Sequence, residues 1–200
     1  MIKTIFDFFL LLLVSPIFLP TIITVSIISF INFKGAIFFT QKRIGLNGKP
    51  FMIYKFKTMN NDRDLNGNLL PDHLRTTKWG SFLRSSSLDE LPSILNIFLL
   101  QMSWVGPRPL PEKYRHRFST TQFKRHLVKP GLTGLAQVNG RNCISWDKKF
   151  EYDLIYANSY SLKLDFFILL KTITIVLKRS NINPKNSHSM PEFTGNKKDV

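Results

Sequence analysis

Apolar residues form one long stretch near the N-terminus, and their spacing changes after it. No charged residue occurs between Phe8 and Phe33, a stretch longer than the roughly 20 apolar residues needed to lie within a bilayer core. A cleaved signal peptide usually has an apolar region of about 7–15 residues followed by a small-residue cleavage site, and no such site follows here. The pattern therefore predicts a membrane-anchoring segment over residues 1–34.

Two interpretations of this segment are open. Hydropathy alone favours a single spanning helix. Proline removes a backbone donor and clashes with the preceding turn, so Ser15-Pro16 predicts a kink or break in mid-run, and Pro20 predicts a second one. Positive charge flanks both ends, at Lys3 and Lys34, and a spanning helix would send Lys3 outward against the positive-inside bias. We therefore expect a re-entrant helix-hairpin with both ends on the cytoplasmic face.

The next segment has the pattern of a β-hairpin. Residues 37–44 and 51–57 flank Asn47-Gly48, a pair that readily adopts the positive φ angles of a hairpin turn. In the second strand Lys55 and Lys57 fall on one face, so their two ammonium groups should project side by side. These lysines either bind an anion or are simply solvated.

Three helices are predicted further along the chain. Apolar residues at i, i+3, i+4, i+7 and i+8 predict a helix with one buried stripe that ends at Gly106-Pro107. The stripe consists of Leu91, Ile94, Leu95, Phe98 and Leu99. A polar and basic helix is expected over 111–127, and a strongly apolar helix with several lysines over 161–179. The last helix suits either the surface of an anionic membrane or a core with solvated lysines.

The remaining segments complete an expected α+β fold. Polar residues 60–73 predict an exposed loop, and the polar C-terminal tail over 181–200 is expected to be loosely ordered. Residues 35–180 form one expected domain on the cytoplasmic face. The fold class is thus a re-entrant membrane helix-hairpin, a short β-hairpin and several amphipathic helices at the membrane interface.

Composition narrows the possible partners. The chain has 200 residues, 44% of them apolar, which is enough for one compact domain and excludes global disorder. Its formal net charge of +15 predicts a densely anionic partner, which could be phospholipid head groups, nucleic acid or a polyphosphate substrate. Cys143 is the one cysteine, so an intramolecular disulfide and a cysteine-rich zinc site are excluded, and a metal would need carboxylate ligands.

The adjacent carboxylates Asp89 and Glu90 are the main candidates for chemistry. Proline is tolerated in the first turn of a helix, so Pro92 places Asp89 near a helix start, where unpaired N–H groups should lower its pKa and keep it ionised. An ionised carboxylate suits a nucleophile or a magnesium ligand. The alternative is structural, because Ser87-x-x-Glu90 also matches a capping box.

Basic residues near this pair favour the chemical interpretation. Arg84 lies just before it, and Pro107 and Pro109 fix the backbone around Arg108, which suits bidentate phosphate binding. Further cations are expected around the pair from Arg43, Lys55, Lys57, Lys129 and Arg141. Together they could bind a diphosphate, with Asp89 holding a divalent cation between the oxygens.

Several runs of the sequence resemble the bacterial sugar transferases, also called monotopic phosphoglycosyl transferases or polyprenyl-phosphate glycosyl-1-phosphate transferases. The runs cover nearly the whole chain in order, which makes the resemblance highly specific. They are Ser15-Pro16, FTQKRIG at 39–45, YKFKTM at 54–59, SLDELP at 87–92, MSWVGPRP at 102–109 and KPGLTGLAQVNGRN at 129–142. The C-terminal PEFTGN looks most like the small single-domain initiators of bacterial N-linked glycosylation, which use UDP-diacetylbacillosamine.

The resemblance implies a two-step reaction at the cytoplasmic face of the bacterial inner membrane. The residue at the position of Asp89 attacks the β-phosphate of a UDP-sugar, UMP leaves, and undecaprenyl phosphate then takes the sugar-phosphate. Glu90 matches the second carboxylate, with a supporting role. The family uses Mg²⁺, and its apolar segment resembles a re-entrant helix bent at Ser15-Pro16. Anionic membrane lipid and downstream membrane glycosyltransferases are further expected partners.

The sequence departs from the family pattern at three places. Ser93 stands where glutamine is usual, Gln101 replaces an acidic residue, and Lys129 replaces an arginine. Two non-enzyme alternatives are a membrane-tethered protein that binds nucleic acid and a lipid-binding scaffold without catalysis. No nucleic-acid motif supports the first, and the carboxylate pair would repel a phosphate backbone, so we expect no nucleic acid among the partners.

Overall fold

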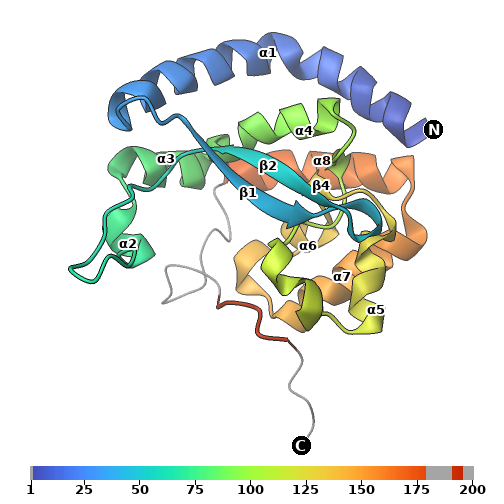
Figure 1. The fold of residues 1–200 in the computed structure, drawn as a ribbon. Helices are drawn as coiled ribbons and strands as arrows, with labels where there is room; N and C mark the ends of the chain where they lie inside the picture. The colour runs from blue at the N-terminus through green and yellow to red at the C-terminus, as the bar shows by residue number, and fades with distance from the viewer. Residues whose placement is uncertain (1, 179–190, 196–200) are drawn as a thin grey trace, which may run out of the picture.

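A single long helix lies across one side of an otherwise mixed helix and strand domain (Figure 1). The structure is a computed structural model that describes residues 2–178 and 191–195, apart from the side chain of Arg141. Helix α1 spans Ile2–Asn32 and, within the described residues, is the one helix long and apolar enough to cross a membrane. The predicted mixture of helices and a short hairpin is therefore confirmed.

Helix α1 continues through both of its prolines. Pro16 has no N–H to donate to the carbonyl of Leu12, and the Ser15 hydroxyl donates to that carbonyl instead, at 2.8 Å. This substitution explains why Ser15-Pro16 does not interrupt the helix, which is arched in Figure 1. The break that Ser15-Pro16 and Pro20 could have made is therefore absent from α1, and the re-entrant path through a membrane stays a prediction.

The N-terminal end of α1 is attached to the domain by polar contacts. The Asp7 carboxylate accepts hydrogen bonds from the Ser103 hydroxyl at 2.9 Å and from the Trp104 backbone N–H at 3.3 Å. The Lys3 ammonium pairs with Asp165, whose carboxylate is fully buried. We call this contact zone between α1 and the domain the seam.

The C-terminal end of α1 is attached to the same domain. The Trp79 indole N–H donates to the buried Ser29 hydroxyl at 2.9 Å, from helix α3 (Lys78–Ser86). Val25 packs with Phe56 and Leu83 in one of the apolar clusters. The opposite face of α1 is apolar and exposed, through Ile5, Phe9, Leu12, Leu13, Ile17, Leu19, Ile23, Ile27, Phe30 and Ile31. Such a continuous apolar face indicates a lipid-facing surface.

The predicted β-hairpin is confirmed. Strands β1 (Phe38–Ile44) and β2 (Pro50–Phe56) pair antiparallel, and the turn between them is a short 3₁₀ helix, η1 (Leu46–Gly48). The two turn residues have positive φ angles, 52° at Asn47 and 76° at Gly48, as the sequence predicts. Loop 60–73 is mostly exposed as expected, and the short helix α2 (Asp72–Arg75) begins within it.

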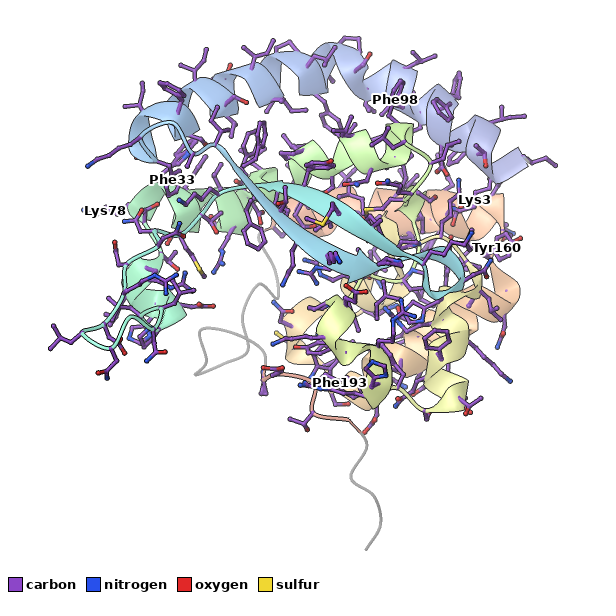
Figure 2. All side chains as sticks on the ribbon, in the orientation of Figure 1. Lys3, Phe33, Lys78, Phe98, Tyr160 and Phe193 are labelled. Carbon is purple, nitrogen blue, oxygen red and sulfur yellow. The ribbon has the colours of Figure 1, made fainter. Side chains whose placement is uncertain are left out.

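The helix predicted from Leu91 is shorter and oriented differently. A 3₁₀ helix, η2 (Leu88–Ser93), runs into α4 (Ile94–Phe98), and the chain turns at Leu100 (φ 61°), well before Gly106. The side facing β2 is polar, because Ser93 and Asn96 bond to the backbone of that strand. The predicted buried stripe is therefore wrong for Leu95, Phe98 and Leu99, which are exposed, and Phe98 meets Phe8 of α1 (Figure 2).

A second pair of strands follows α4. Strands β3 (Ser103–Val105) and β4 (Gly131–Thr133) are parallel. The prediction of one helix over 111–127 is wrong, because a capping box formed by Ser119 and Gln122 begins a new helix in the middle of this range. Three short helices take its place: η3 (Glu112–Arg117), α5 (Thr120–Phe123) and η4 (Lys124–Leu127).

The chain after β4 is more helical than its sequence predicts. Short helices α6 (Leu135–Val138) and η5 (Arg141–Cys143) precede α7 (Trp146–Ser159), which had no sequence prediction. Helix α8 (Leu162–Leu177) confirms the predicted last helix. Its Phe166, Phe167, Leu170 and Ile173 are exposed while Asp165 and Ile168 are buried, which favours an interfacial position over a core helix.

The described part of the predicted tail, residues 191–195, is anchored by the buried Phe193, contrary to the expectation of a loose tail, and residues 181–190 and 196–200 lie outside the described structure. Phe193 is 3% exposed and contacts the rings of Tyr114, Phe118, Trp146 and Phe150 (Figure 2). The polar composition of the tail gives no sign of this one aromatic anchor. Burial of its ring stabilises the contact by more than the conformational entropy that ordering a short segment costs.

Candidate active site

The carboxylate pair lies on η2, directly after a strained backbone position. Ser87 adopts a left-handed conformation (φ 60°) between α3 and η2, and its side chain makes no capping hydrogen bond. The Glu90 side chain does not turn back to Ser87 either, because Lys55 and Arg108 bind it. The capping box that offered a structural explanation of this pair is therefore absent from the described structure of η2.

Glu90 is held by two cations. Its Oε1 lies 2.5 Å from the Lys55 ammonium and 2.5 Å from Nη2 of Arg108, while its Oε2 accepts from Nη1 of Arg108 at 3.2 Å. Although burial opposes ionisation, Arg108 and Lys55 hold the pKa of Glu90 well below its ordinary range. Glu90 in turn raises the pKa of Arg108. Glu90 is thus a fixed anion, and the fork of Arg108 points at a carboxylate rather than standing free for phosphate.

Asp89 has the opposite environment. Among the described residues none donates a hydrogen bond to its carboxylate, although Lys55, Arg108 and Arg84 act on it through their charges. Burial, together with the negative charge of Glu90, raises the pKa of Asp89 to about 6. The predicted lowering by a helix start is therefore wrong, because η2 is a short 3₁₀ turn and burial beside a second carboxylate outweighs its dipole.

Lys55 of β2 and Lys57, just after the end of that strand, point to different places. Lys55 is on the same face as the buried Phe51 and Ile53, so it enters the domain and reaches Glu90. Lys57 lies over the ring of Phe33, at 5.7 Å from its centroid, at the end of α1. The prediction of two ammonium groups side by side is therefore wrong.

Two arginines complete the immediate surroundings. Arg84 Nε donates to the Thr58 hydroxyl at 3.1 Å, and its charge acts on Asp89. Arg43 Nη1 donates to the Pro109 carbonyl at 3.0 Å, while its buried Nε has no hydrogen-bond partner within the part of the chain that the structure describes. Burial and the charge of Arg108 lower the pKa of Arg43 to about 10. A small hollow beside Glu90 is lined by Arg43, Lys55, Glu90, Ser93 and Arg108 among others, and Asp89 is not among its lining residues.

Two other predicted cations are not placed in this hollow. The charge of Lys129 acts on Asp7 in the seam, and Lys129 is not among the residues that line the hollow. The side chain of Arg141 lies outside the described structure.

The donor set for a metal ion is small. Within the described residues no group of three or more His, Cys, Asp or Glu side chains could hold a metal. Because no donor among the described residues occupies the oxygens of Asp89, this carboxylate could bind a hard cation whose other oxygen ligands come from a substrate. Glu90 does not fit that role, since Lys55 and Arg108 occupy both of its oxygens.

Sequence reasoning missed the residues that hold η2 in place. The Ser93 hydroxyl donates to the Tyr54 carbonyl at 2.7 Å, and Asn96 donates to the Met52 carbonyl at 2.7 Å and to Gln101 Oε1 at 2.8 Å. Ser93 and Gln101 are two of the departures from the family pattern, and both join this network. An asparagine inside an apolar pattern was the available signal.

A long apolar helix over a domain whose paired carboxylates lie among cations describes a membrane-associated class of protein. The chain belongs to the bacterial sugar transferase family, which it matches over residues 1–179. It is 46% identical over 198 residues to the "uncharacterized sugar transferase EpsL" of Bacillus subtilis (strain 168), across 97% of this chain and 96% of EpsL. The predicted family is thereby confirmed.

Other relatives have names that state an activity or a process. The UDP-glucose:undecaprenyl-phosphate glucose-1-phosphate transferase of Klebsiella pneumoniae is 39% identical over 176 residues, which is 82% of this chain and 37% of that protein. The exopolysaccharide production protein ExoY of Sinorhizobium fredii is 38% identical over 183 residues, which is 83% of this chain and 79% of ExoY. These names support a sugar transferase.

Proposed function

We propose that this protein transfers a sugar 1-phosphate from a UDP-sugar to undecaprenyl phosphate, with Asp89 as the nucleophile. The observation that carries the proposal is the contrast within the pair. Glu90 is saturated by Lys55 and Arg108, whereas the Asp89 carboxylate has no hydrogen-bond donor among the described residues. A carboxylate nucleophile needs a free lone pair and an ionised state, which Asp89 has above its pKa of about 6.

The proposed reaction consists of two displacements at one phosphorus. An Asp89 oxygen forms a bond to the β-phosphorus of the UDP-sugar, and the bond to the bridging oxygen breaks with its electron pair on UMP. An oxygen of undecaprenyl phosphate then attacks the same phosphorus, and the bond to Asp89 breaks to restore the carboxylate. Covalent catalysis separates a nucleotide-sugar and a lipid phosphate that would otherwise have to meet at one centre.

The cations near the pair are the proposed stabilisers of this transfer. Attack by a carboxylate on a diphosphate brings like charges together, which is unfavourable unless positive charge compensates. Arg84 and the half-exposed Arg108 act on Asp89 through their charges, and the buried Nε of Arg43, which lines the hollow, has no partner among the described residues. Mg²⁺ fits the free carboxylate of Asp89 and would, when bound, neutralise charge on the diphosphate.

The identity of the sugar is a separate proposal. The C-terminal PEFTGN resembles initiators that use UDP-diacetylbacillosamine, so we propose an N-acetylated amino sugar. Relatives are named for other sugars, including the UDP-glucose transferase of Klebsiella pneumoniae and the UDP-galactose-lipid carrier transferase of Erwinia amylovora. UDP-glucose and UDP-galactose are therefore the competing substrates.

For topology we propose a re-entrant α1 on the cytoplasmic face of the bacterial inner membrane. Lys3 and Asp7, near the start of α1, contact Asp165 and Ser103, whereas Ser29, near its end, contacts Trp79. A spanning helix would place its two ends on opposite sides of a bilayer core about 30 Å thick. Attachment of both ends to one domain supports a helix that enters and leaves on the same side.

Release of UMP tests the proposed activity. Detergent-solubilised protein is incubated with Mg²⁺, undecaprenyl phosphate and each of UDP-diacetylbacillosamine, UDP-glucose and UDP-galactose. We expect continued UMP release to require undecaprenyl phosphate. We also expect the release to be fastest with UDP-diacetylbacillosamine. If none of the three UDP-sugars gives UMP, the proposed activity is rejected and a binding protein is favoured.

Cysteine labelling in intact cells tests the topology. Ile2→Cys is made in a Cys143→Ser background, and Asn158→Cys serves as a matched control on the exposed end of α7. We expect an impermeant maleimide to label neither site until the cells are permeabilised. Labelling of residue 2 but not residue 158 in intact cells would mean that α1 spans the membrane.

A further inference from the structure

A buried ion pair lies behind the loop that carries Arg108. Arg125 of η4 is 2% exposed, and Asp153 of α7 is 4% exposed. Arg125 donates to Oδ2 of Asp153 from Nε at 2.9 Å and from Nη2 at 2.7 Å. Removing two charges from water is unfavourable, and a buried ion pair often contributes little to the free energy of unfolding. We therefore look for a role of this pair other than stability.

The remaining donors of Arg125 are also committed. Nη2 donates to the backbone carbonyl of Arg108 at 2.7 Å. Nη1 lies 3.3 Å from Nε2 of His126, and Nδ1 of His126 lies 3.0 Å from the Phe123 carbonyl. Burial and the charge of Arg125 lower the pKa of His126 to about 3, so the ring is neutral and its Nε2 can accept from Arg125 while Nδ1–H donates. The guanidinium therefore has one fixed orientation.

The Arg108 loop depends on outside donors for its shape. Its flanking residues Pro107 and Pro109 have no N–H groups, so the loop cannot stabilise itself through them. Each carbonyl of the loop is bound instead: the Gly131 N–H donates to Pro107 at 3.0 Å, Arg125 to Arg108 at 2.7 Å and Arg43 to Pro109 at 3.0 Å. Arg125 is the member of this set that bonds to the residue whose side chain meets Glu90.

We propose that Arg125 and Asp153 are positioning residues that place the Arg108 guanidinium on Glu90. Neither member of the pair is among the residues that line the hollow beside Glu90. It acts through the Arg108 backbone, and the two hydrogen bonds between Arg108 and Glu90 follow from that placement. Positioning of this kind matters because a displacement of about 1 Å at a catalytic group can lower a rate about 100-fold. The role in transfer rests on the proposed function.

The main test is Arg125→Lys, with Arg117→Lys as a matched control. Lysine keeps the charge but cannot bond to Asp153 and the Arg108 carbonyl with a planar fork. Arg117 also binds one carboxylate, of Glu192, and one backbone carbonyl, of Phe193, but at the C-terminal segment. We expect UMP release by Arg125→Lys to fall roughly 10- to 100-fold, and that by Arg117→Lys to stay near wild type.

The split between kcat and KM separates positioning from a general loss of structure. Arg108 meets Glu90 next to the proposed nucleophile, so a displaced Arg108 should lower kcat per folded molecule in Arg125→Lys and in Asp153→Asn more than it raises KM for the UDP-sugar. A purely structural role would lower the thermal midpoint and the amount of active protein, with kcat per folded molecule unchanged. An unchanged kcat per folded molecule would overturn the proposal.

A double variant tests whether Arg125 acts through Arg108. In an Arg108→Ala background, Arg125→Lys should cause no further loss of rate, whereas independent roles would give multiplying losses and contradict the proposal. If the wild-type protein releases no UMP, the proposed function fails, and crystal structures of wild type and Arg125→Lys test the positioning instead. A longer distance between Arg108 Nη2 and Glu90 Oε1 in the variant supports it, and an unchanged distance refutes it.

Discussion

The carboxylates of two regions of this molecule, the seam along α1 and the site on η2, have different partners. In the seam, Asp7 accepts from Ser103 and Trp104, and Asp165 accepts from Tyr156 at 2.6 Å and pairs with Lys3. These carboxylates join elements together. In the site, Asp89 has no hydrogen-bond donor among the described residues. A carboxylate with a structural role accepts hydrogen bonds on its oxygens, whereas a carboxylate that reacts needs an oxygen without such a bond.

The same substitution in the two regions should have opposite results. Asp89→Asn replaces the nucleophile by an amide of the same shape, so turnover should fall by at least about 1,000-fold with little change in thermal midpoint. Asp7→Asn makes the same chemical change in the seam and should retain turnover per folded molecule. UMP release and thermal unfolding in detergent measure both. Similar rates for the two variants would remove the distinction between the regions.

Within the site, Glu90→Gln should separate the two members of the pair. Glutamine cannot neutralise Lys55 and Arg108, so turnover should fall about 100-fold. Only ionised Asp89 attacks, so kcat/KM of the wild type should rise with pH through about 6. The negative charge of Glu90 raises the pKa of Asp89, and its removal should therefore move the acid limb to lower pH.

The position of that limb in Glu90→Gln checks the electrostatic coupling. A limb that stays where it is in the wild type would mean that Glu90 does not influence the ionisation of Asp89. A limb that moves to higher pH would mean that the freed Lys55 and Arg108 no longer face Asp89.

The smallest effect on chemistry is expected far from both regions. Phe193→Ala removes a buried ring from the cluster of Tyr114, Phe118, Trp146 and Phe150, which should lower the free energy of unfolding by about 3 kcal/mol. Turnover per folded molecule should be affected less than by either site variant. Denaturant unfolding measures the loss. A change below about 0.5 kcal/mol would contradict the packed position of this segment.

The sequence predicts those parts of the fold whose cause is local. The hairpin turn at Asn47-Gly48 and the apolar helix α8 follow from turn chemistry and periodicity, and both are confirmed. The packed Phe193 was not predictable, because a lone aromatic residue in a polar tail gives no periodic signal. The division of residues 111–127 into short helices depends on one capping box, formed by Ser119 and Gln122.

The candidate site shows the same division between local and distant causes. Asp89 and Glu90 are recognisable from adjacent residues and from the family resemblance. The pKa of Asp89 was predicted in the wrong direction, because burial and Glu90 outweigh the helix start. The ion pair between Lys55 and Glu90 depends on the packing of η2 against β2, which the hydrogen bonds of Ser93 and Asn96 stabilise. Contacts between distant segments of this kind are not visible in a local pattern.

The most direct test of the central claim is a measurement of the intact mass of the protein. The protein is first incubated, without undecaprenyl phosphate, with a UDP-sugar that it uses as a substrate. Asp89 as nucleophile predicts a mass increase equal to one sugar phosphate, lost again when the lipid phosphate is added, and no increase in Asp89→Asn. Turnover without any adduct on the wild-type protein, or an adduct on Asp89→Asn, would contradict Asp89 as the nucleophile.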